Sequence, residues 1–311
     1  MPAITSANVA QAIVKLVAAD ALSPLVGALV MGNLVNRDYE PTLAQAGDTV
    51  NIPIPPVLGA NNIAEAGTVQ TQNPSLGNAQ IILNTHAEAT FQIPDVTKVL
   101  AVPDLLKVYM QPAIIAIAES IESTLMNLYI NATINAPVGG SSAMDEARVD
   151  LAETQLFKQK VPRTAPKFMV VSPTAYGQLR QLPRFTDYQN VGPSGQPSAQ
   201  ITGSLPGAPG ADGKIKDFTV FRSQFVAYNS STTTAFNLAF ARDGIGLVIR
   251  RLPMPIPGTG AIAEYAELGN FGVRIIMSYQ PNTLAQQFTV DVLYGCAILR
   301  NNFVQIVENN G

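Results

Sequence analysis

The side chains best suited to catalysis or metal binding are rare in this sequence. His86 is its one histidine and Cys296 its one cysteine, so a single chain cannot build an imidazole or thiolate metal cluster. His86 stands in a strand-like segment with no serine or cysteine motif beside it, which favours a structural or surface role. Cys296, between LYG and AIL, has the surroundings of a small buried hydrophobe. We therefore predict no catalytic residue and no metal ligand at these two positions.

Two further patterns match functional motifs only in their letters. Glu119 and Glu122 are three residues apart, but on an amphipathic helix such a pair usually forms a solvated or inter-subunit face. Residues 258–263 match a dinucleotide fingerprint, yet they follow LPMPIP instead of a strand and lack a βαβ unit. The sequence has no G-x-S-x-G elbow, no G-K-[ST] phosphate loop and no Asp-rich calcium loop. These patterns predict a protein that is not an enzyme and that uses no cofactor or metal.

The composition indicates a surface that is largely covered by other subunits. Hydrophobic residues make up 47% of the chain and charged residues only 13%, about half the usual share. The net charge is −3 and the longest basic run is Arg250-Arg251, which argues against a dedicated nucleic-acid binder. The apolar run 21–35 is interrupted by Pro24 and Gly27 and is too short to span a bilayer. We expect a soluble protein without a membrane partner, made in a reducing cytosol.

One long helix is the element around which the rest of the chain is predicted to be organised. Residues 103–136 are expected to form it, over about 45 Å at ~1.5 Å per residue. Pro112 predicts a kink or a fresh helix start. The apolar stripe that predicts the buried face consists of Ile114, Ile117, Ile121, Leu125, Leu128 and Ala132.

Strand-like segments flank this helix on both sides, so the fold class is α+β. Residues 48–94 are strand-rich, with a Gly- and Asn-rich middle, and predict an extended two-stranded loop. Residues 183–216 are rich in Gly and Pro and predict a long functional loop. Asp243-Gly244 predicts a hairpin between the two strands beside it. The last region predicts two paired strands around Pro281-Asn282.

The predicted loop region has charge of one sign. Between Arg37 and Lys98 the sequence contains no Lys or Arg, and its acidic residues invite a basic partner surface. We predict that the acidic side chains contact a neighbouring subunit, and that arginines in the later strands receive them. The inter-subunit residues in this hypothesis are Asp38, Glu40, Asp48, Glu65, Glu88, Arg242, Arg250, Arg251 and Arg274.

The order of these parts resembles the major capsid protein of tailed bacteriophages, with the Hong Kong 97 fold. The text of residues 32–40 (GNLVNRDYE) followed by residues 47–53 (GDTVNIP) is similar to the junction of arm and loop in the phage coat-protein branch of that family. Residues 239–253 and 290–307 resemble the C-terminal strands of the same branch.

The resemblance implies an architecture of four parts. It assigns residues 1–47 to an N-terminal arm, 48–94 to an extended loop, 95–139 with 240–311 to a peripheral domain, and 140–239 to an axial domain. Some family members cross-link a loop lysine to an asparagine of a neighbour. Residues 38–97 contain no lysine, so noncovalent contacts are expected here.

The resemblance also implies function and partners. It implies a structural protein that self-assembles into hexamers, pentamers and then an icosahedral shell. The shell would enclose double-stranded DNA without sequence-specific binding, assemble in the host cytoplasm and remain in the virion. A separate scaffolding protein and a portal are the implied partners. The alternatives are an encapsulin-like nanocompartment shell protein of the same fold and a virion tail or decoration protein, which would lack the long central helix.

Overall fold

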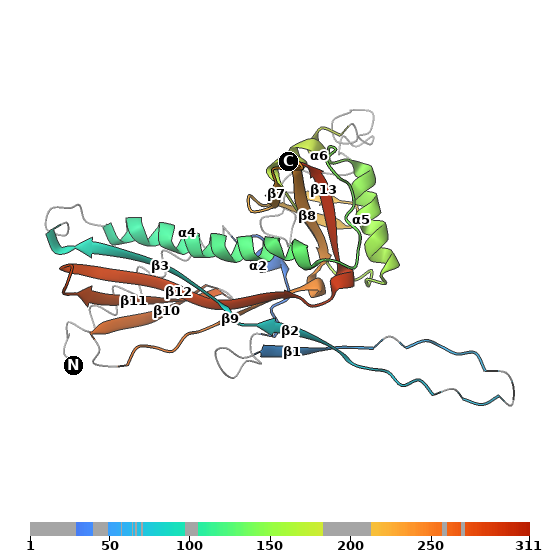
Figure 1. The fold of residues 1–311 in the computed structure, drawn as a ribbon, viewed down its shortest axis with the longest axis horizontal. Helices are drawn as coiled ribbons and strands as arrows, with labels where there is room; N and C mark the ends of the chain where they lie inside the picture. The colour runs from blue at the N-terminus through green and yellow to red at the C-terminus, as the bar shows by residue number, and fades with distance from the viewer. Residues whose placement is uncertain are drawn as a thin grey trace, which may run out of the picture.

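The computed structural model describes residues 29–39, 49–56, 58–63, 65, 67–69, 71–96, 105–182, 213–256, 260–268 and 271–311 of the chain. Its described parts form a long sheet with one helix lying along it, a second sheet with two helices at one end of the first, and a projecting two-stranded hairpin (Figure 1). This mixture of helices and sheets is the predicted α+β class. Most of the predicted arm and of the predicted loop 183–216 lie outside the described residues.

The long sheet has the strand order β10-β11-β12-β3, and β9 pairs with the second half of β12. The predicted pairing around residues 281–282 is confirmed as the antiparallel pair β11–β12. In β3, residues alternate between a half-buried inner face that includes Ala87, Ala89 and Phe91 and an exposed outer face, because successive side chains of a strand point to opposite sides. The strands are β3 (Thr85–Pro94), β9 (Ile245–Arg250), β10 (Ala261–Leu268), β11 (Phe271–Gln280) and β12 (Ala285–Ile298).

Helix α4 (Leu105–Met126) lies along the inner face of the long sheet and is followed by a 3-10 turn, η2 (Asn127–Asn131). All six residues of the predicted apolar stripe are buried, so the prediction of the packed face is confirmed. The helix has 22 residues, about 33 Å, and is therefore shorter than predicted. It also passes through Pro112 without a fresh start. Pro112 is exposed.

Part of α4 is long and apolar enough, by length and composition, to cross a membrane (Tyr109–Asn131). Half of this segment is buried, and its buried apolar side chains belong to the core that it shares with the long sheet, the arm and the second sheet.

The second sheet has the order β13-β8-β4-β6-β5, with β7 also paired to β8. Its strands alternate between two cores: Met169 and Val171 pack with α5 and α6, whereas Val170 belongs to the core around α4. The sheet is therefore buried on both faces, and it joins the two helical layers. Its elements are α5 (Glu146–Lys158), β4 (Lys167–Val171), α6 (Pro173–Arg180), β5 (Gly213–Ile215), β6 (Phe218–Arg222), β7 (Ala227–Asn229), β8 (Thr234–Ala241) and β13 (Val304–Asn310).

The hairpin predicted at Asp243-Gly244 is wrong. Strand β8 pairs with β13 and β4 in the second sheet, whereas β9 pairs with β12 in the long sheet. The short turn η4 (Arg242–Gly244) between them is the crossing point from one sheet to the other. The Gly244 carbonyl accepts N–H bonds from Leu299 and Arg300, where the chain makes a second crossing between the two sheets through η5 (Asn301–Phe303). The Asp-Gly pair favours a hairpin turn, but the hydrogen bonds to Leu299 and Arg300 hold it in a connection between two sheets.

The projecting hairpin consists of β1 (Thr49–Ile54) and β2 (Gly77–Ile82), which pair only with each other. The expected extended loop 48–94 therefore ends before β3, which pairs with β12 over ten residues. The last strand, β13, likewise lies beside β8 and not in the long sheet. Both shifts follow from strand pairing between distant segments, about 200 residues apart for β3 and β12 and about 70 for β8 and β13, which leaves no local signal in the sequence.

A glycine marks the place where the hairpin crosses the long sheet. A Cβ atom on Gly295 would lie 2.3 Å from the Ile82 carbonyl oxygen. We expect Gly295→Ala to lower the stability of the subunit by about 1–3 kcal/mol, measured as a fall in the thermal unfolding midpoint. Gly177→Ala is the matched control, because a Cβ at this position in α6 meets nothing within 4 Å and alanine favours helix. Equal midpoints for the two variants would contradict the close crossing.

Candidate functional site

The hairpin has a fixed base and an exposed end. At its base, Val50, Ile52 and Ile81 are buried against Val248 and Leu293 of the long sheet. Beyond the paired strands, the two limbs of the loop are joined by the Gln72 side chain, whose Nε2 donates to the Gly59 carbonyl and whose Oε1 accepts from the Gly59 amide at 3.1 Å. The loop is thus attached firmly at one end and extends away from the body (Figure 1).

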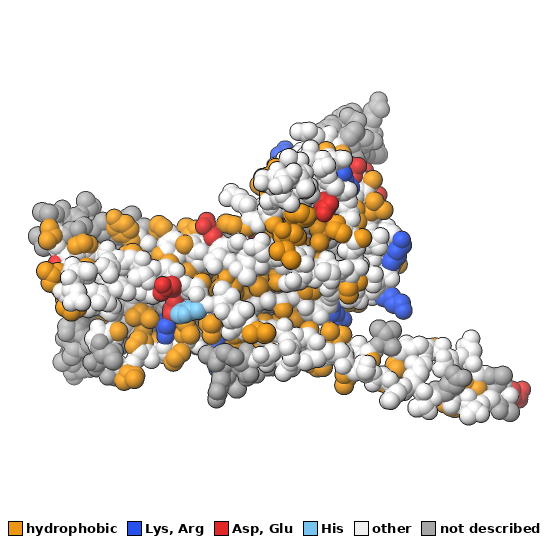
Figure 2. Space-filling view, viewed as in Figure 1, with side chains coloured by type: hydrophobic (Ala, Val, Ile, Leu, Met, Phe, Trp, Pro, Cys, Tyr) orange, Lys and Arg blue, Asp and Glu red, His pale blue; other side chains and the backbone are white. Residues whose placement is uncertain are grey.

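The described loop residues expose apolar side chains that their own chain leaves uncovered. Leu58 is 62% exposed, Val69 74% and Leu76 72%. Figure 2 shows the loop as a thin extension with little charge along it except at its far end. Glu65 is exposed in this loop. Several exposed apolar side chains on one projecting segment make it a candidate surface for binding another molecule.

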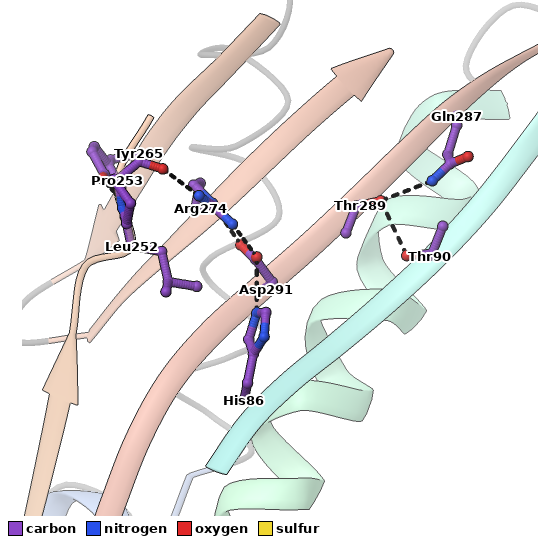
Figure 3. A network of polar contacts seen from close by, with 9 residues as sticks. All are labelled: His86, Thr90, Leu252, Pro253, Tyr265, Arg274, Gln287, Thr289 and Asp291. Carbon is purple, nitrogen blue, oxygen red and sulfur yellow. Dashed lines mark hydrogen bonds and ion pairs between the residues drawn. The ribbon is translucent and has the colours of Figure 1, made fainter. Parts of the chain in front are cut away.

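A buried carboxylate ties three strands together on the outer face of the long sheet, and Arg274 extends the network to the segment after β9 (Figure 3). Asp291 on β12 is 3% exposed, and its two oxygens accept from Nε and Nη2 of Arg274 on β11, the first at 3.0 Å. His86 on β3 contacts the same carboxylate, with 3.0 Å between Nε2 and Oδ2. Arg274 also donates to the Pro253 carbonyl, and Tyr265 on β10 donates to the neighbouring Leu252 carbonyl. The network fixes strand register and holds the segment after β9.

His86 and Arg274 therefore act within the chain. His86 has the predicted structural or surface role. Arg274, which we predicted as a receiver for the acidic loop, is bound to Asp291 of its own chain with a side chain only 13% exposed. Glu88 lies directly opposite Asp291 in the β3–β12 register, so two acidic residues share one row of the sheet. The Arg274 cation and the His86 contact offset their repulsion.

The structure describes four of the other predicted inter-subunit residues, Asp38, Arg242, Arg250 and Arg251. Asp38 and Arg242 are brought together within one chain, at 3.6 Å. Arg250 ends β9, and the Arg251 guanidinium lies 5.6 Å from the centre of the Tyr265 ring. Glu40 and Asp48 lie outside the described residues.

The arm segment 29–39 meets α4 and η4 where the two sheets join. Asn36 pairs with β9 through bonds to the Ile245 carbonyl (2.9 Å) and from the Leu247 amide (3.0 Å), and its side chain donates to Asp243 at 3.0 Å. On the other side, the Gly32 amide, in the short helix α2 (Met31–Leu34), donates to Glu122 of α4 at 3.2 Å. The arm segment therefore joins α4 to the crossing between the two sheets.

The prediction that Glu119 and Glu122 form a solvated or inter-subunit face is wrong for Glu122. Its side chain is fully buried, whereas Glu119 is exposed. The sequence contained a usable signal, because Ala118, Ile121, Glu122 and Leu125 follow the helical spacing of a buried face. Burial raises the pKa of Glu122 to about 7, against the lowering effect of backbone N–H donors from the arm.

The remaining candidates for chemistry show no reactive arrangement. Cys296 is partly buried, and desolvation raises the pKa of its thiol to about 11, so it stays protonated and unreactive at neutral pH. Residues 261–268, which follow the fingerprint-like glycines, form strand β10, whereas a dinucleotide site requires a helix there. Among the described residues, no three His, Cys, Asp or Glu side chains are grouped to hold a metal ion.

The Asp291 network yields a stability prediction. We expect Asp291→Ala to destabilise the subunit by about 3–5 kcal/mol, because it leaves the Arg274 guanidinium largely buried without its anion. Denaturant unfolding of the purified subunit measures the loss. His86→Ala is the control and should cost far less, since the His86 side chain is half exposed. Similar losses for the two variants would show that the ion pair does not dominate the network.

Comparisons with known proteins give one family match and several likenesses of fold. The sequence matches the family model described as phage capsid protein over residues 95–280. No curated protein sequence matches at a significant level. The fold is similar to a chain of Mycobacterium phage Che8, at 16% identity and a TM-score of 0.66, with 90% of each chain covered. It is also similar to a chain from the capsid of Ralstonia phage GP4, at 11% identity and a TM-score of 0.60, covering 89% of this chain and 87% of that one.

A chain of the holo-SrpI encapsulin complex from Synechococcus elongatus is also similar, at 14% identity and a TM-score of 0.50, covering 85% of this chain and 82% of that one. At these identities, the structural likenesses establish the Hong Kong 97-type fold. The match to the family model spans well over half of the sequence, from the end of β3 through α4 and the second sheet to β11. This chain belongs to the phage capsid protein family.

Proposed function

We propose that this chain is the major capsid protein of a tailed bacteriophage and that it self-assembles into an icosahedral shell around a double-stranded DNA genome. The observation that supports this most directly is the projecting hairpin loop with uncovered apolar side chains. In a closed shell of like subunits, each loop lies on a neighbour and each subunit receives one, so that burial at ~25 cal/mol per Å² stabilises every contact. Many such contacts act together in a closed assembly.

The two sheets correspond to the two domains of the proposed subunit. In this proposal the long sheet with α4 is the peripheral domain, and the second sheet with α5 and α6 is the axial domain. We assign residues 85–94 to the peripheral domain because they pair with β12, and residues 304–310 to the axial domain because they pair with β8.

The acidic loop region and the later arginines remain the proposed electrostatic contacts between subunits. Glu65 and Glu88 are exposed and are the proposed donors of negative charge, together with Glu40 and Asp48. Arg250 and Arg251 are the proposed receivers on the neighbouring subunit. Asp38, Arg242 and Arg274 form ion pairs in their own chain, and Arg251 also contacts the Tyr265 ring, so a contact between subunits would involve exchange or sharing of those partners.

The proposed partners follow from this role. Pentamers and hexamers of the chain form the shell, with a separate scaffolding protein and a portal, and DNA is enclosed without sequence-specific binding. The protein acts as a structural component of the virion, assembled in the host cytoplasm, and has neither a catalytic nor a membrane role.

A nanocompartment shell protein is the second candidate, because an encapsulin chain shares the fold. Both candidates form closed shells, and they differ in what the shell contains. Enclosed nucleic acid supports the phage capsid, whereas enclosed protein cargo supports the nanocompartment.

Electron microscopy and light scattering of the purified protein test the proposal. We expect closed shells, or rings of five and six subunits, from the protein alone or co-expressed with its scaffolding protein. Monodisperse monomers or open tubes under both conditions would contradict a capsid role.

Charge reversal tests the electrostatic contact. We expect Arg250→Glu with Arg251→Glu to reduce the yield of shells by at least tenfold, because each reversal replaces attraction with repulsion at a repeated contact. Arg250→Lys with Arg251→Lys is the matched control and should assemble normally. Thermal unfolding checks that each subunit remains folded. A normal shell yield from the reversed protein would remove these two residues from the contact.

A further inference from the structure

Glu122 is a buried acid that joins two segments 90 residues apart in the sequence. One carboxyl oxygen, Oε1, accepts from the Gly32 amide at 3.2 Å, and the backbone N–H groups of Val30 and Met31 also act to lower the pKa of the carboxyl group. The other oxygen, Oε2, is buried without a hydrogen-bond partner among the described residues. A buried polar atom without a partner is costly, so this contact is not explained by stability alone.

The rest of the arm segment packs around this contact. Leu29, Met31, Leu34 and Val35 are buried in the core that contains the inner face of α4. They hold the segment over Glu122 and keep water from the carboxyl group. If the segment lifts, the carboxyl group is exposed to solvent on the side that the arm now covers.

No charged side chain of the described residues compensates Glu122, whose pKa responds only to burial and to the three arm amides. Helix α2 contributes no ionisable side chain. Most ionisable groups on the elements packed around this core are engaged or exposed. Tyr294 bonds to Ser120 and Thr124, Asp243 to Asn36, Asp291 to Arg274 and Arg242 to Asp38, Tyr129 stacks on Phe236, and Glu119 is exposed. Arg37 is buried, and Tyr39 and Cys296 are partly buried.

We propose that Glu122 is a proton-operated latch for the arm, which holds residues 29–36 against α4 while it is neutral and favours their release once it is ionised. Release would free residues 29–36 from α4, so a local proton equilibrium would set how tightly this segment is held. The latch is a property of the single subunit and does not depend on shell formation.

The direction of the pH effect follows from linkage. The carboxyl group binds its proton more tightly in the closed arrangement, with a pKa of about 7, than in water, where the value is 4.5. The closed arrangement is therefore most favoured below pH 4.5 and weakens as the pH rises to about 7. It levels off at higher pH, where both arrangements are ionised.

Hydrogen exchange on the unassembled full-length subunit tests the latch. The readout is the protection factor of a peptide covering residues 29–36, corrected for the intrinsic pH dependence of exchange. We expect protection to fall about tenfold between about pH 6 and about pH 8, relative to peptides from β4 and α6. Trypsin gives a second readout, because Arg37 is the one basic residue between Lys15 and Lys98, and cleavage there should accelerate with the same profile.

Three variants make the test specific. Glu119→Gln removes the exposed acid one turn away and should keep the tenfold change. Glu122→Gln and Glu122→Leu remove the titrating group in polar and apolar form, and either one, if folded, should show constant relative protection across the same pH range. The proposal is overturned if the wild-type segment shows no relative change, if β4 and α6 lose protection equally, or if a Glu122 variant keeps the change.

Discussion

The structure depends on the burial of one face of α4 against β12. Ile114, Ile117 and Ile121 of the helix share a core with Val290 and Val292 of the strand. β12 is the longest strand described, with 14 residues, and it pairs with β11 and then β9 on one side and with β3 on the other. The hairpin base also packs against it. Once this helix and strand are in contact, the positions of the loop, the arm and the second sheet follow.

The crossing region beside β12 explains how a protein with few charges holds an extended shape. The chain passes between the two sheets twice, through η4 and η5, and both crossings meet at the Gly244 carbonyl. The arm segment lies against the same place through Asn36. Several of the described charged side chains form ion pairs within the chain, such as Arg274 with Asp291 and Lys167 with Asp217. The exposed surface left over is rich in uncharged and apolar groups, which suits contact with other subunits.

Patterns of local origin were predictable from the sequence, whereas pairings of distant segments were not. The α4 stripe was predicted because helical periodicity lies within one segment, and the β11–β12 pair because its strands are adjacent. The hairpin at Asp243-Gly244 was predicted wrongly, because η4 accepts hydrogen bonds from Asn36, Leu299 and Arg300. These residues are far from η4 in the sequence, so the local pattern does not contain them. Glu122 was misassigned for a related reason: its residue type indicated solvent, and only its spacing within the stripe indicated burial. The inter-subunit residues stay predictions, because their proposed partners belong to another chain.

The central claim is that the exposed loop between β1 and β2 is completed by a neighbouring copy of the chain. Cryo-electron microscopy of assembled particles, at a resolution that shows side chains, tests it most directly. The proposal predicts that residues 55–76 lie on an adjacent subunit, with Leu58, Val69 and Leu76 covered by it. A particle in which this loop contacts only its own subunit, or projects freely into solvent, would contradict it.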